Sequence, residues 1–100
     1  MVKHIILWTL KDAYDGPEKA RIKRDIKEGL EGLMGQIPGL LEIRVHAEGL
    51  ETSNADLMLE AAFENFEALK AYAVHPAHLA VANGRVRPYT ASRACLDYEL

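Results

Sequence analysis

The sequence has one cysteine, no excess of positive charge and no long hydrophobic run. Because Cys95 stands alone, an intrachain disulfide and a cysteine-rich zinc site are excluded, and we expect a protein of the reducing cytoplasm. The net charge is −3, and acidic residues interrupt the only basic stretch, residues 19–27, so no nucleic-acid partner is expected. The apolar stretch from Val2 to Leu10 is too short to cross a bilayer, so it predicts a strand and no membrane partner.

The 100 residues are 49% hydrophobic and 27% charged, a balance that predicts one domain over residues 1–100 with a packed core. Alternating apolar and polar residues indicate strands, and apolar residues three or four apart indicate helices. These patterns predict strands at 2–10, 41–48, 56–63 and 92–100, a long helix at 16–37, and shorter helices at 66–75 and 77–83. The order β-α-β-β-α-β is that of an α+β ferredoxin-like fold with a four-stranded antiparallel sheet.

The helices carry more specific expectations. Leu33 and Ile37 continue the apolar stripe of the long helix, which Pro38 should end. Gly29 should let this helix lie close to the sheet, and Gly84 should end the last helix in a left-handed conformation. Asp15 and Asn65 are expected to cap the first and second helices.

Other expectations concern burial. Leu41 should share the inner face of the second strand with Ile43, and Phe66 should share the buried stripe of the second helix with Tyr72. Cys95 is interpreted as a small core residue.

The predicted sheet needs a cover on both faces. Helices in this element order can cover only one face, yet the first strand is apolar on both, and Leu96, Tyr98 and Leu100 form a further apolar set. A second sheet is the simplest cover, so we expect a homodimer formed through sheet faces.

The segment from Tyr72 to His78 contains a phenol and two imidazoles around Pro76. Histidine exchanges a proton near neutral pH, and a phenol can donate a hydrogen bond to a carbonyl or a developing enolate. These residues could therefore catalyse proton transfer next to a carbonyl. They could equally be structural, with Tyr72 as a core aromatic and His75 or His78 fixing loop backbone.

The order and spacing of several motifs resemble the stress-responsive A/B barrel (Dabb) family over about residues 2–98. These motifs are the start Val2-Lys3-His4, the turn Ile37-Pro38-Gly39, the segments Phe63-Glu64-Asn65-Phe66 and Tyr72-x-x-His75-Pro76-x-His78, and the final Asp97-Tyr98. The resemblance implies a homodimeric barrel whose two sheets pack face to face. The family includes a plant polyketide cyclase that works without a cofactor.

The resemblance to that cyclase also implies roles for individual residues. Tyr72 and His78 match its catalytic residues, and His4 matches a pocket histidine, which turns the even-numbered face of the first strand toward the helices. Lys27, Arg93 and Cys95 match further pocket positions. We expect a small apolar carbonyl compound to bind between helices and sheet, with catalysis by Tyr72 and His78 and a lining of His4, Ile6, Trp8, Ile26, Leu30, Leu59 and His75.

Two other functions remain open. One is a non-catalytic stress-protective dimer or assembly with structural histidines, and the other is a cofactor-free monooxygenase of the kind that also uses such barrels. A cavity on the order of a few hundred Å³ reaching Tyr72 and His78 would favour the carbonyl-binding hypothesis. No cofactor is expected, and no metal, because His4, His75 and His78 lack a plausible further ligand.

Overall fold

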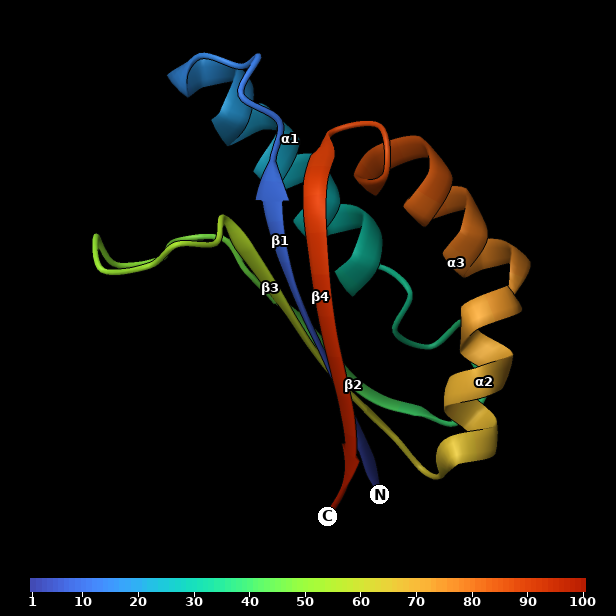
Figure 1. Cartoon of the computed structure of the whole chain (residues 1–100). Helices are drawn as coiled ribbons and strands as arrows, with labels where there is room; N and C mark the ends of the chain where they lie inside the picture. Colours follow the sequence, from blue (N-terminus) through green and yellow to red (C-terminus); the bar gives the residue numbers. More distant parts are fainter.

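The computed structural model describes all 100 residues and has a four-stranded antiparallel sheet with helices packed on one face (Figure 1). The strands follow one another across the sheet in the order β2-β3-β1-β4. This arrangement confirms the predicted α+β ferredoxin-like fold. The elements in chain order are β1 (Val2–Leu10), α1 (Gly16–Glu31), β2 (Leu40–His46), β3 (Leu57–Phe63), α2 (Phe66–Val74), α3 (Pro76–Val81), the π-helical segment η1 (Ala82–Val86) and β4 (Thr90–Glu99).

The first strand, β1, is central in the sheet and pairs with the last strand, β4. It pairs with β3 on one side and β4 on the other, so that His4 lies opposite both Ala61 and Asp97. The N- and C-termini therefore lie next to each other (Figure 1). The even-numbered residues of β1 are all buried, as expected for the face that packs against the helices.

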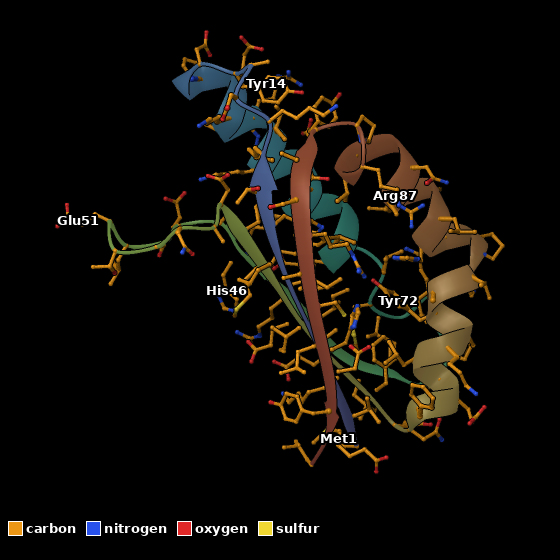
Figure 2. The ribbon with its side chains drawn as sticks, in the orientation of Figure 1. Met1, Tyr14, His46, Glu51, Tyr72 and Arg87 are labelled. Carbon is orange, nitrogen blue, oxygen red and sulfur yellow. The ribbon has the colours of Figure 1, made fainter.

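The other face of the sheet has no helix over it. Leu7, Leu96 and Tyr98 lie on this face with 42%, 66% and 43% of their surface exposed, and the side chain of His46 also points away from the helices (Figure 2). We call this surface the open face. No helix of the structure is long and apolar enough to cross a membrane.

The first helix ends earlier than the sequence predicts. Asp15 caps its start, because its carboxylate accepts a hydrogen bond from the Glu18 amide at 2.9 Å. The helix stops at Glu31, and Leu33 and Ile37 are buried from the turns that follow. The long-helix prediction was wrong because an apolar stripe reports burial, whereas glycine-rich backbone after Glu31 disfavours helix.

Gly29 packs against another helix rather than the sheet. A Cβ atom at this position would lie 2.9 Å from Val81 Cγ1 and 2.8 Å from Arg85 Cδ. The missing side chain therefore lets α1 approach α3 and η1, which corrects the expected contact with the sheet. Gly84 is also not a left-handed cap, since it lies inside η1 and has no positive φ.

Three expectations about strands and burial need correction. The register of β2 against β3 shifts between Leu40 and Glu42, so Leu40 is buried in place of Leu41. Phe66 is exposed because it is the first residue of α2, immediately after the capping Asn65, and Lys70 lies over its ring. The last strand begins at Thr90, two residues before the predicted start.

Candidate functional site

A cavity of about 160 Å³ lies between the helix-facing side of the sheet and the layer of α2, α3 and η1. Fourteen residues line it, nine of them hydrophobic, so the site is mainly apolar with a few polar groups. It reaches both Tyr72 and His78, although it is smaller than the volume expected from the sequence. Seven of the nine proposed site residues line the cavity, namely His4, Ile6, Trp8, Leu30, Leu59, Tyr72 and His78.

The break between α2 and α3 brings Tyr72 and His78 together. In a continuous helix, residues six positions apart would lie about 240° apart around the axis and about 9 Å apart along it. Here the two ring centroids are 4.2 Å apart, with the ring planes tilted by 41°. Figure 2 shows Tyr72 between the sheet and the helix layer.

His75 holds this break and does not line the cavity. Its backbone is extended, with φ −66° and ψ 133°, as the following Pro76 requires. The Ala77 amide donates a hydrogen bond to His75 Nδ1 at 3.1 Å, so the imidazole caps α3. Ile26 also lies outside the lining, because it is fully buried in the core between α1 and the sheet.

Two residues that line the cavity each have a buried polar atom without a hydrogen-bond partner. These atoms are the Tyr72 hydroxyl and His78 Nδ1. A buried polar group left unpaired costs about 1–3 kcal/mol, so such groups are uncommon in folded proteins. The two atoms belong to neighbouring rings, and one bound molecule could pair with both.

Burial sets the protonation of these two groups. It raises the pKa of Tyr72 far above its usual value, against an opposing effect of the Arg93 charge. Burial also lowers the pKa of His78, and the charges of Arg87, His4 and Arg93 lower it further, although the Ala73 carbonyl acts in the opposite direction. At neutral pH the phenol is therefore a hydrogen-bond donor and the imidazole a neutral base.

His4 forms a carboxylate–imidazole pair with Asp97. Its Nδ1 donates a hydrogen bond to the Asp97 carboxylate across the β1–β4 pairing, and Nε2 has no protein partner. The His4 ring lies 6.1 Å from the Tyr72 ring, centroid to centroid. The carboxylate thus fixes the orientation of an imidazole in the cavity wall.

Cys95 joins this pair to form the one group that could hold a metal ion, which we call the β1–β4 donor cluster. One donor atom from each of His4, Cys95 and Asp97 lies within 4.8 Å of the others. The hydrogen bond between His4 and Asp97 leaves no room for an ion between them. Burial, followed by the Asp97 charge, raises the pKa of the Cys95 thiol, which disfavours the thiolate that a metal needs. The residues as arranged do not fit a metal.

Cys95 itself corrects one expectation and Lys27 another. Cys95 is exposed, because it lies on the edge strand β4. The prediction of a core residue was wrong because the alternation of residues along a strand does not show whether the strand lies at the edge of the sheet. Lys27 points toward β2, where its ammonium donates hydrogen bonds to Glu31 and to the Val45 carbonyl, both at 2.8 Å. It therefore does not line the cavity.

Arg93 does line the cavity, as its position in the resemblance implied, and Arg87 lines it as well. Arg87 follows η1 directly and was not predicted from the sequence. No motif singles it out, and its place depends on the wide π-helical turn that ends the helix layer.

The family model of the stress-responsive A/B barrel domain matches residues 2–100. A dimeric protein of unknown function with a ferredoxin-like fold, from Bacteroides fragilis, is 33% identical, with a TM-score of 0.91 over 99% of this chain and 95% of that chain. A comparison with curated proteins gives no match.

Two more distant structures share the fold. A hydroxynitrile lyase from Passiflora edulis is 17% identical, with a TM-score of 0.72 over 97% of this chain and 90% of that chain. SnoaB, a cofactor-independent oxygenase from Streptomyces nogalater, is 13% identical, with a TM-score of 0.73 over 99% of this chain and 91% of that chain. At these identities the likeness concerns the fold alone. The match over residues 2–100 shows that the chain belongs to the stress-responsive A/B barrel (Dabb) family.

Proposed function

We propose that this Dabb protein binds a small, mainly apolar carbonyl compound and transfers a proton next to the carbonyl, using Tyr72 and His78. The observation that carries the proposal is the pair of buried, unpaired polar atoms on neighbouring rings in one mainly apolar cavity. A carbonyl oxygen would accept a hydrogen bond from the phenol, and the adjacent C–H group would face the imidazole.

The chemistry of the step follows from the protonation of the two groups. Neutral His78 accepts a proton from the carbon next to the carbonyl, and the electron pair of the broken C–H bond passes to the carbonyl oxygen. Tyr72 donates a hydrogen bond to this oxygen as its negative charge develops, in a site with little water. His4, oriented by Asp97, positions the substrate. Return of the proton to another carbon or to the oxygen completes an isomerisation without a cofactor. In a cyclisation the enolate carbon would instead form a bond to a second carbonyl carbon of the same molecule, and the oxygen of that carbonyl would take the proton.

The existence of enzymes with the same fold supports this proposal by analogy only. A hydroxynitrile lyase and a cofactor-independent oxygenase are built on similar scaffolds, so the architecture can carry catalysis. In this chain the functional argument depends on the cavity and its two unpaired atoms.

Hydrogen–deuterium exchange would test the proposed step. Small ketones would be incubated with the protein in D₂O, and exchange of the α-hydrogens would be followed by NMR. We expect His78→Ala and Tyr72→Phe each to slow exchange by about 10²-fold or more. Tyr14→Phe is the matched control, because Tyr14 does not line the cavity. Exchange that persists in both site variants would contradict the proposal and favour a non-catalytic dimer.

We also propose that the protein is a homodimer formed through the open face, and that it is cytoplasmic. The exposed Leu7, Leu96 and Tyr98 supply an apolar surface, and the relative from Bacteroides fragilis is described as dimeric. Sedimentation equilibrium should give twice the chain mass of 11.1 kDa. Leu96→Glu should give monomers, whereas Leu50→Glu, in the exposed loop after β2, should not. A wild-type mass of one chain would refute the dimer.

A further inference from the structure

We infer that the ligand of the cavity is an oxo acid, a short apolar carbonyl compound whose carboxylate lies between Arg87 and Arg93. This inference rests on the proposed function and names its substrate class. It depends on the charges around the cavity, on its polar groups and on its size.

The polar side chains in the cavity wall are mainly hydrogen-bond donors. They are His4, Tyr72, His78, Arg87, Thr90 and Arg93, and no aspartate or glutamate is among them. Tyr72, Thr90 and the two arginines are donors toward a ligand, whereas His4 uses its Nδ1 proton for Asp97 and His78 acts as a neutral base. The Asp97 carboxylate on β4 is already bonded to His4, which lines the cavity. A site with this composition is suited to a ligand that is rich in acceptor oxygens and carries negative charge.

The two arginines come from separate elements that flank the cavity. Arg93 lies on β4 opposite Trp8 of β1, and Arg87 follows η1 on the helix side. Neither guanidinium forms an ion pair with an acidic side chain. Both arginines line the same cavity as His78, and the side chain of Arg87 also donates a hydrogen bond to the Asn83 amide oxygen. Their positive charges lower the pKa of the His78 imidazole. A ligand in this cavity can therefore place its carbonyl at His78 and its anionic end against the arginines.

The size of the cavity limits the rest of the molecule. A cavity of about 150 Å³ holds benzene, so about 160 Å³ accommodates one short branched chain or a single ring. Ile6, Trp8, Leu30 and Leu59 surround this part of the cavity with apolar groups. The carboxylate can extend toward the arginines, which are exposed to solvent. Tail, carbonyl and carboxylate then follow in the order found in a 2-oxo acid.

Two matched probes would test this inference. One is 4-methyl-2-oxopentanoate, and the other is 5-methylhexane-2,3-dione, in which a methyl ketone replaces the carboxylate without changing the number of non-hydrogen atoms. Calorimetric titration would give the affinity of each, and NMR in D₂O would follow exchange of the same α-hydrogens. We expect the oxo acid to bind about tenfold more tightly than the dione, and added salt to reduce the difference.

Variants of the arginines separate charge from shape. Arg93→Gln and Arg87→Gln should each weaken oxo-acid binding about tenfold and leave dione binding unchanged, while Arg93→Lys should restore part of the loss. Arg85→Gln is the control, because the Arg85 guanidinium donates a hydrogen bond to the Asp25 carbonyl at 3.0 Å and does not line the cavity.

The possible outcomes distinguish this inference from the proposed function. If both probes bind equally and the arginine variants change neither affinity, the oxo-acid inference is wrong and the carbonyl site stands. If neither probe binds at millimolar concentration, or if both bind but Tyr72→Phe and His78→Ala leave exchange unchanged, the proposed function fails as well.

Discussion

Removing the Tyr72 hydroxyl should make the protein more stable and less active. The side chain is 1% exposed, and its oxygen has no hydrogen-bond partner. Tyr72→Phe keeps the ring, whose packing against Phe63 at 5.0 Å and His78 at 4.2 Å between centroids is retained. A buried hydroxyl without a partner costs about 1–3 kcal/mol. Because the variant also loses the packing contacts of the oxygen atom, we expect the lower end, a gain of about 1 kcal/mol in the free energy of unfolding.

Urea unfolding followed by the fluorescence of Trp8, the only tryptophan, would measure this change. Wild type and variant would be compared at one concentration, since the stability of a dimer depends on concentration. A gain of 1 kcal/mol corresponds to a rise of about 4–8 °C in Tm for a domain of this size. Tyr14→Phe is the control, because the hydroxyl of this half-buried tyrosine is not among the buried unpaired groups and should change stability by less than about 0.5 kcal/mol.

A loss of stability in Tyr72→Phe would refute this reasoning. It would mean that the hydroxyl is paired within the folded protein and is not held free for a ligand. A gain in stability together with loss of α-hydrogen exchange would show that the unpaired group is kept for function at the expense of stability.

Four further predictions follow from the structure. His75→Ala should lower the free energy of unfolding by about 1 kcal/mol through loss of the α3 cap, whereas His78→Ala should leave urea unfolding nearly unchanged. The folded state lowers the pKa of His78, so acidification through about pH 6.5 protonates this residue in the unfolded chain before it does so in the folded protein. The free energy of unfolding should therefore decrease as the pH falls, and it should decrease more in wild type than in His78→Gln, as unfolding at about pH 7.5 and 5.5 would show. Gly39→Ala should lower the free energy of unfolding by about 2 kcal/mol or more in thermal unfolding, since φ is 81° and the new Cβ would lie 2.5 Å from Ala68 Cβ. Gly84→Ala is the control, because a Cβ at this position meets nothing within 4 Å, and an equal cost there would contradict this reason. Elemental analysis of tag-free protein should find no stoichiometric metal, and one zinc per chain would show that the β1–β4 donor cluster rearranges to bind it.

Local patterns predicted most of the secondary structure. Strand β1 begins and ends where its composition indicates, and β3 begins one residue after the predicted start. Asp15 and Asn65 cap the helices as expected, because these signals act over a few residues. The end of α1 was wrong because Leu33 and Ile37 keep helical spacing after the helix has stopped. Burial in the same core maintains this spacing whether the backbone is helical or turned.

The candidate site was only partly accessible from sequence. Tyr72 and His78 stand close together in the chain, and the proline between them indicates the bend that brings their rings together. The bond from His4 to Asp97 joins residues 93 positions apart, so it depends on the register of β1 against β4. Short-range patterns do not carry that register, which is why the role of Asp97 appears only in three dimensions.

The edge strand β4 presents two different surfaces on alternate residues. Arg93 and Asp97 face the helices, whereas Leu96 and Tyr98 face the open side of the sheet. Loss or gain of one residue within this strand would exchange the two sets and damage the proposed ligand site and the proposed dimer surface together. Substitution at a single position would change only one of them. A point change on the inner side of β4 is therefore expected to alter the proposed ligand site without disturbing the proposed dimer, whereas a change in the length of the strand would alter both.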